Sequence, residues 1–79
     1  MPEVKKSPLA LFISNQVKKR RLEKGWSQAV LAVKLEVSDA FIGQTELPHY
    51  RTKYNLEHLY KLAIIFHCKV QDFLPEEVL

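Results

Sequence analysis

One segment in the middle of the chain combines small residues with an amide side chain, a mixture suited to reading the edges of DNA bases. On a helix that turns about 100° per residue, with Ile42 facing a core, Ala40 and Gln44 point almost directly away. A helix in the major groove needs small residues for close approach, and the amide of Gln44 can pair bidentately with adenine. With the two residues that flank this outer line, the predicted base-reading residues are Ala40, Phe41, Gly43 and Gln44.

Two of these residues also have structural explanations, which the sequence leaves open. Phe41 could touch a thymine methyl group, or it could pack under Tyr50 or Tyr54. Gly43 should cost a helix about 1 kcal/mol relative to alanine, so close approach to DNA would give it a reason. If Gly43 does not serve close approach to DNA, the outer side of this helix is an ordinary solvent-exposed surface that contains a weak helix former.

The charged residues are distributed unevenly along the chain. The net charge is +3 and the isoelectric point is about 9.1. Basic residues crowd residues 18–24, Arg51 and Lys53 form a second basic pair, and acidic residues gather near the C-terminus. This asymmetry favours one face that meets phosphate groups. A run of charges can equally be the solvated face of a helix.

These candidate residues must be positioned by helices, because apolar residues recur at helical spacing and no segment shows the alternation of a strand. Serine or asparagine stands at the start of four predicted helices as an N-cap, and proline follows two of the helices. The chain is therefore predicted to be all-α, with five short helices over residues 8–24, 28–35, 39–47, 56–67 and 70–74.

The second and third predicted helices are short and separated by a turn of about three residues, which is the helix-turn-helix plan. Two short helices with a turn also occur in proteins that never touch DNA. With 79 residues there is room for one small domain. We expect a flexible N-terminal tail over residues 1–7, a helix-turn-helix domain over residues 8–75 and a C-terminal tail over residues 76–79.

Other classes of function find little support in the sequence. Cys68 is the one cysteine, and it makes no metal-ligand spacing with the three histidines. No nucleophile–base set or glycine-rich phosphate loop is present, so we expect neither an enzyme nor a bound cofactor. The sequence shows no signal peptide and no apolar run of the roughly 20 residues that span a bilayer. We therefore expect a cytoplasmic protein with no membrane contact.

A set of positions spread over most of the chain forms a pattern that is specific in combination. They are Arg21, Gly25-Trp26-Ser27-Gln28-Ala29, Leu31-Ala32, Val37-Ser38, Ile42, Glu46, Leu59, Leu62-Ala63 and Phe73-Leu74. In this combination the chain resembles the lambda-repressor/Cro-like (XRE) helix-turn-helix family. The resemblance implies a compact five-helix lambda-repressor-like domain that binds double-stranded DNA.

The same resemblance implies roles for individual polar residues. Gln28 opens the second helix and would bond a DNA phosphate with the help of the amides in its first turn. Arg21 would pair with Glu46 in a partly buried structural salt bridge, although both side chains could instead be solvated. The loop after the third helix matches the family's phosphate-contacting segment. The implied phosphate contacts are Gln28, Arg51 and Lys53. From the first helix, Arg20 is expected to add a phosphate contact, with Lys18 and Lys19 as the neighbouring alternatives.

The chain departs from the family pattern in three places. Glu46-Leu47-Pro48 stands where the family often has Glu-x-Gly, so the following loop should approach DNA differently. His67 replaces the glycine that usually ends the fourth helix, so this helix must tolerate a strained cap or end in another way. The third helix carries no lysine or arginine, which predicts weak guanine readout.

Apolar residues that fall off the core stripes predict a homodimer, formed by the fifth helix, the end of the fourth and the tail. They are Leu22, Ile64, Ile65, Val78 and Leu79. Two third helices about 34 Å apart would then read a palindromic operator. Within this regulator class a phage-type repressor, a restriction–modification controller and a toxin-binding antitoxin stay open, with a stand-alone repressor favoured. The rival is a protein-interaction module that uses the same fold without binding DNA.

Overall fold

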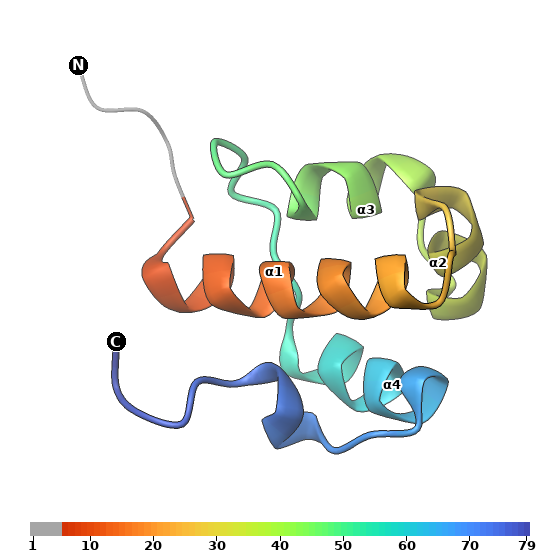
Figure 1. The fold of residues 1–79 in the computed structure, drawn as a ribbon. Coiled ribbons are helices and arrows are strands. Elements are labelled where there is room, and N and C mark those ends of the chain that lie inside the picture. Colours follow the sequence, from red (N-terminus) through yellow and green to blue (C-terminus); the bar gives the residue numbers. More distant parts are fainter. Residues whose placement is uncertain (1–5) are drawn as a thin grey trace.

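The computed structural model describes residues 6–79, which form four α-helices and one 3₁₀ turn. The elements are α1 (Pro8–Glu23), α2 (Gln28–Leu35), α3 (Asp39–Thr45), α4 (Leu56–Phe66) and the 3₁₀ turn η1 (Val70–Phe73). In Figure 1, α1 crosses the middle of the molecule, with α3 on one side of it and α4 and η1 on the other. The helix α2 lies at the C-terminal end of α1. The chain is all-α, as expected.

The expectation of a fifth α-helix over residues 70–74 is wrong, because this segment forms η1 instead. Its hydrogen bonds span three residues, as in the bond from the amide of Leu74 to the carbonyl of Gln71 (3.1 Å). Pro75 disfavours the helical region for the residue before it, and Leu74 is extended (φ −106°, ψ 150°). The stretch between α4 and this proline therefore has room for one tight turn, which still buries Phe73.

Each α-helix starts at the capping residue that the sequence predicts. The side-chain oxygen of that residue accepts a hydrogen bond from the backbone amide three positions on, which satisfies one of the free donors of the first turn. The four N-caps are Ser7, Ser27, Ser38 and Asn55. In α4 a reciprocal bond completes a capping box, because Nδ1 of His58 accepts from the backbone amide of Asn55 (3.0 Å).

Three helices are followed by a residue in the left-handed region of the backbone. Gly25 adopts φ 73° after α1, as its type predicts, but Glu36 (φ 65°) and His67 (φ 56°) adopt the same region without being glycine. Such a residue pays about 1–2 kcal/mol for the contact of its Cβ with the backbone. Of the two ways for α4 to end that the sequence left open, the structure therefore uses the strained cap at His67.

The core lies where the four helices and η1 meet. Its fully buried side chains come from every element, and the aromatic ring of Trp26 stacks on that of Phe66 at 5.3 Å between centroids. They include Val17, Leu31, Leu35, Ile42, Leu62 and Phe73. In the part of the chain that the structure describes, no helix is long and apolar enough to span a bilayer.

The predicted N-terminal tail lies mostly outside the described residues, but its last two positions are ordered parts of the domain. Lys6 is buried, and Ser7 caps α1. The sequence placed both in the tail, because a lysine before a helix start carries no signal of burial.

Candidate nucleic-acid interface

The helix α3 is anchored by Ile42, which is fully buried, and by Thr45, which is buried beside it. The opposite side of the helix therefore faces away from the core, as the spacing of its residues predicts. Ala40 is exposed there, whereas Phe41, Gly43 and Gln44 are half-buried. Of the four predicted base-reading residues, the structure thus leaves Ala40 open on the outer side, partly covers Gly43 and Gln44, and packs Phe41 against the core.

The ring of Phe41 packs against two aromatic side chains that follow α3 in the chain. It meets Tyr54 edge-on at 5.8 Å between centroids and lies 4.9 Å from His58. The sequence left open whether Phe41 touches a thymine methyl group or packs under Tyr50 or Tyr54. In the structure it packs against Tyr54. Burial raises the pKa of Tyr54 to about 12, so its hydroxyl stays neutral against the hydroxyl of Thr45 (3.1 Å).

Gly43 faces α2 as well as solvent. A Cβ added to it would lie 3.4 Å from Oε1 of Gln28, at the near limit of ordinary van der Waals contact. The packing against Gln28 therefore does not require a glycine at this position.

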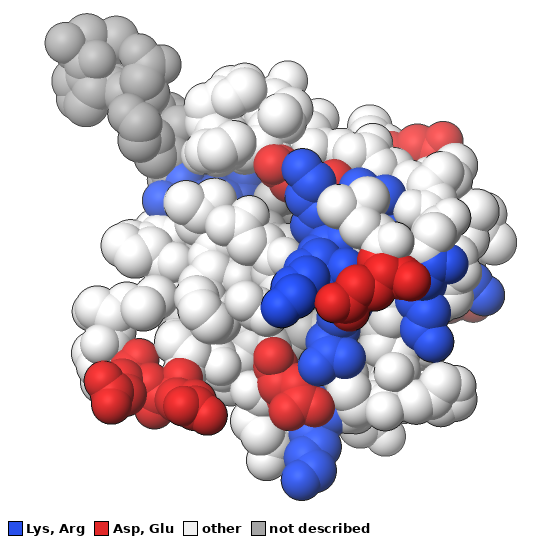
Figure 2. Space-filling model, viewed as in Figure 1, with Lys and Arg blue, Asp and Glu red and all other residues white. Residues whose placement is uncertain are grey.

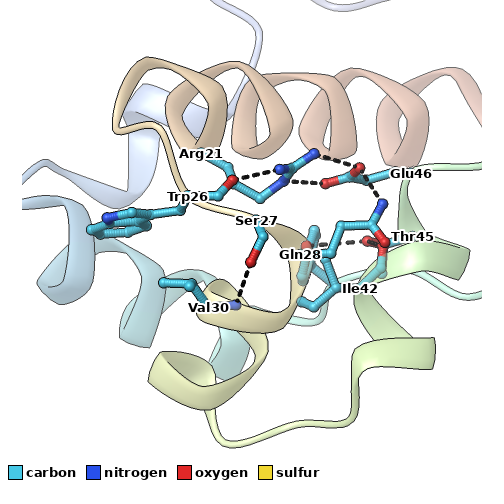
Figure 3. Close-up of polar contacts among 9 residues, drawn as sticks. Arg21, Trp26, Ser27, Gln28, Val30, Ile42, Thr45 and Glu46 are labelled. Atoms are coloured by element: carbon cyan, nitrogen blue, oxygen red, sulfur yellow. Dashed lines mark hydrogen bonds and ion pairs between the residues drawn. The ribbon is translucent and has the colours of Figure 1, made fainter.

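A hydrogen-bonded network joins α1 to the ends of α2 and α3 (Figure 3). Nε and Nη2 of Arg21 donate to the two carboxylate oxygens of Glu46 at 2.8 Å and 3.0 Å, and Nη1 donates to the carbonyl of Trp26 at 2.7 Å. The Arg21 and Glu46 side chains are only 7% and 4% exposed. The structure therefore brings the predicted pair together as a bidentate and largely buried ion pair.

Gln28 belongs to the same network. Its Nε2 donates to Oε1 of Glu46 at 2.9 Å, although the residue as a whole is exposed at the first position of α2. The amide nitrogen carries two hydrogens, so one stays available beside the backbone amides of the first turn. This is the arrangement that a helix N-terminus needs to hold a phosphate.

The loop between α3 and α4 carries the two other predicted phosphate contacts next to α3. Arg51 and Lys53 are exposed, and together with Lys6 and Ser7 they line a hollow in the surface. Thr52, which lies between them, donates a hydrogen bond from Oγ1 to Oε1 of Gln44 (2.8 Å). The basic loop is therefore tied directly to the outer part of α3.

Lys6 is a site residue that the sequence reasoning missed. Its Nζ donates to the carbonyls of Gln44 (2.9 Å), Leu47 and Tyr50 (2.8 Å), and burial lowers its pKa. The last carbonyls of a helix lack partners within the helix, and a cation suits them. One sequence feature indicates that a basic side chain from elsewhere could bind the C-terminal carbonyls of α3, because the helix has no basic residue in its own last turn. The sequence does not indicate which basic residue this would be.

Arg20 is the predicted phosphate contact that the structure does not bring together with the others. Its Nη2 lies 3.9 Å from Oδ2 of Asp72, and its guanidinium lies 5.5 Å from the centre of the Phe73 ring. Arg20 is thus turned toward η1, which lies on the other side of α1 from α3 (Figure 1). Figure 2 shows basic side chains over the C-terminal half of α1 with acidic ones among them, which fits a solvated helix face.

Comparisons with known proteins identify the fold. No family model and no curated protein matches the chain. Among solved structures, it is similar to a hypothetical transcription factor NHTF from Neisseria, with a TM-score of 0.72, 21% identity and coverage of 85% of this chain and 75% of that one. It is also similar to the restriction-modification controller protein C.AhdI from Aeromonas hydrophila, with a TM-score of 0.70, 20% identity and coverage of 82% and 96%.

The N-terminal DNA binding domain of SinR from Bacillus subtilis has a higher sequence identity to the chain. The TM-score is 0.70 and the identity 27%, over 84% of this chain and 94% of that one. A structure of SinR in complex with DNA matches with a TM-score of 0.67, 26% identity and coverage of 77% and 95%. Each of these structures shares with the chain the arrangement of helices described above. The chain therefore has the helix-turn-helix fold of these transcription regulators, as its resemblance to the XRE family implied.

Proposed function

We propose that this chain is a sequence-specific DNA-binding regulator of transcription in which α3 enters the major groove. The observation that carries the proposal is the orientation of α3, whose Ile42 is fully buried while Ala40 and Gln44 lie on the outer side. A helix of this kind, preceded by a short helix and a tight turn, is the reading element of helix-turn-helix proteins. The fold shared with the DNA binding domain of SinR supports the proposal.

Phosphate groups would be held at two places that both contact α3. One is the N-terminus of α2, where Gln28 and the first-turn amides offer hydrogen-bond donors. The other is the loop with Arg51 and Lys53, which Thr52 ties to Gln44. Such contacts fix the position of the protein on the duplex, while the outer residues of α3 read the bases.

The test is the salt dependence of DNA binding, measured by fluorescence anisotropy with duplexes selected from random sequence. Neutralising one phosphate contact should reduce the slope of log K against log salt by about 0.9. We expect this for Arg51→Ala and Lys53→Ala separately. Lys69→Ala is the matched control, since Lys69 is an exposed lysine beside η1 rather than beside α3. Wild-type protein that binds no duplex, or slopes that do not respond to either loop variant, would refute the proposal.

We further propose that the protein acts as a homodimeric repressor on a palindromic operator. A hollow between the start of α1 and the C-terminal segment is lined by apolar side chains, among them Leu9, Leu74, Val78 and Leu79. All four are substantially exposed in the single chain, and a second copy would cover them. Ile65 packs against the core and does not contribute to this surface.

The rival function is a protein-interaction module, of which a toxin-binding antitoxin is one form. The observation that favours it is the outer side of α3, which carries no charged residue and whose Phe41, Gly43 and Gln44 are half-buried. An uncharged, half-covered helix face suits a protein partner as well as a major groove. The salt titration separates the two, because a protein-interaction module would show no steep salt dependence toward DNA.

A further inference from the structure

Thr52 is not itself a proposed contact with DNA, but its hydroxyl holds the side chain that α3 would present to a base. Oγ1 of Thr52 donates to Oε1 of Gln44 at 2.8 Å, and both residues are half-buried. The bond crosses from the loop after α3 to the last turn of α3. It therefore acts on the one amide side chain that the helix has available for direct readout.

Gln44 is held from its backbone as well. Its backbone carbonyl accepts a hydrogen bond from the buried ammonium group of Lys6 at 2.9 Å. Both the backbone and the side chain of Gln44 are therefore held, although the residue lies in the last turn of a helix, where carbonyls lack partners within the helix. Among residues 6–79, no hydrogen bond engages Nε2 of Gln44. The side-chain carbonyl oxygen thus already accepts one hydrogen bond with one of its two lone pairs, and the amide nitrogen keeps both of its hydrogens for a ligand.

We propose that Thr52 is a specificity-determining positioning residue that makes Gln44 a hydrogen-bond donor toward DNA. This inference rests on the proposed function of the chain. With Oε1 turned back to the loop, Gln44 can donate to a base that offers acceptors in the major groove, and guanine offers two, N7 and O6. Bidentate pairing with adenine needs Oε1 to accept from the adenine amino group. The bond from Thr52 uses one of the two lone pairs of Oε1 and holds this oxygen toward the loop, and this orientation disfavours the adenine pairing.

The assignment differs from the adenine pairing that the residue type of Gln44 suggests, and from the weak guanine readout expected of a helix without lysine or arginine. The proposed guanine preference differs from these expectations because of Thr52, which lies eight positions after Gln44 in the chain and orients its side chain. An amide that has been oriented in advance also loses less conformational freedom on binding than one that has not.

The test compares four duplexes that differ only at the base pair that Gln44 reads. Selection from random DNA with the full chain gives the preferred site, and the position whose preference disappears in Gln44→Ala identifies that base pair. We expect wild-type protein to prefer guanine over adenine there by about fivefold or more, the range of one good base contact. Thr52→Val removes the hydroxyl at similar size and should reduce this preference to less than twofold. Thr52→Ser keeps the hydroxyl and should restore the preference.

Three controls separate positioning from general damage. Thr52→Val should leave the salt slope and the affinity for unselected DNA unchanged, because these report phosphate contacts. Its thermal unfolding should match that of the wild type. In the Gln44→Ala background, Thr52→Val should have no further effect on base preference, since a positioning residue acts only through the group that it holds.

Several outcomes would overturn the inference. A wild-type preference for adenine or cytosine at this base pair would mean that the amide presents its oxygen instead. An unaltered preference in Thr52→Val, or an equal loss on all four duplexes, would mean that the bond does not set specificity. These results leave DNA binding itself intact, whereas wild-type protein that binds no duplex refutes the proposed function and this inference together.

Discussion

Glu46 shows how one carboxylate at the end of α3 serves two neighbouring helices. It accepts from Arg21 of α1 through both oxygens and from Gln28 of α2 through one. The ion pair with Arg21 is almost fully buried, so the attraction between the two charges is opposed by the cost of removing both from water. The contribution of this residue is therefore to geometry more than to net stability, because it sets where Gln28 lies relative to α3.

His58 should make the stability of the domain depend on pH. Burial, and secondarily the charge of Lys61, lower its pKa below the ordinary value of 6.5. Its Nδ1 must also stay unprotonated to accept from the amide of Asn55. Between the lowered pKa and 6.5 the unfolded chain binds more protons than the folded one, so the free energy of unfolding should fall as the pH drops through this window.

Urea denaturation of wild-type and His58→Gln proteins between pH 5 and 8 would measure this effect. Glutamine keeps an acceptor for the capping box but does not titrate. The difference in unfolding free energy between the two proteins should be constant above about pH 7 and shift against the wild type below it. A difference that stays constant over the whole range would contradict the assignment to His58.

At the scale of the helices, much of the arrangement follows from local signals. The serine and asparagine caps, the glycine after α1 and the apolar stripes predict where the four α-helices lie, to within one or two residues. The segment before Pro75 carries the same kinds of signal, but over residues 70–74 it forms η1 and not an α-helix. Of the apolar residues that set its helical pattern, which are Val70, Phe73 and Leu74, only Phe73 is buried.

Contacts between distant segments could not be predicted from local patterns. Lys6 reaches the end of α3 from before α1, and Thr52 reaches Gln44 from a loop. Both depend on the packing of the helices, which brings together residues that are far apart or unrelated in spacing. The resemblance to a known family implied the pair of Arg21 and Glu46, whereas residue spacing alone left it open.

The pair of Arg21 and Glu46 should be strongly coupled, because it holds α1 and α3 together. Arg21→Met or Glu46→Leu leaves the partner charge buried and unpaired, which should cost about 3–5 kcal/mol of unfolding free energy. The double variant removes both charges and should cost clearly less than the sum of the two single changes. Urea denaturation of the four proteins gives this cycle, and additive costs would show that the two side chains act independently.

At the scale of the whole molecule, a basic hollow and an apolar hollow adjoin each other at Ser7. Lys6, Arg51 and Lys53 line the first with Ser7, and the second lies between the start of α1 and the C-terminal segment. Arg51 and Lys53 do not line the apolar hollow, so a dimer formed through it need not bury them. Two α3 helices held in this way could address half-sites one helical turn apart.

The proposed dimer predicts an oligomeric state that surface charges should control. Val78→Glu with Leu79→Glu places like charges at the apolar surface of both copies, so sedimentation equilibrium should show a dimer for the wild type and a monomer for this variant. Val33→Glu changes an exposed valine on α2, outside the apolar hollow, and should remain dimeric. Wild-type protein that stays monomeric with and without operator DNA would exclude the dimer.

The burial of Lys6 has a practical consequence for anyone who labels this protein. Because this lysine is fixed under the loop and lines one hollow with Arg51 and Lys53, a group attached at Lys6 would lie beside the proposed DNA surface. A tag joined after Leu79 would instead emerge at the apolar hollow. Neither Lys6 nor Leu79 is a neutral attachment point, so a fluorophore for binding studies belongs on a helix surface remote from both.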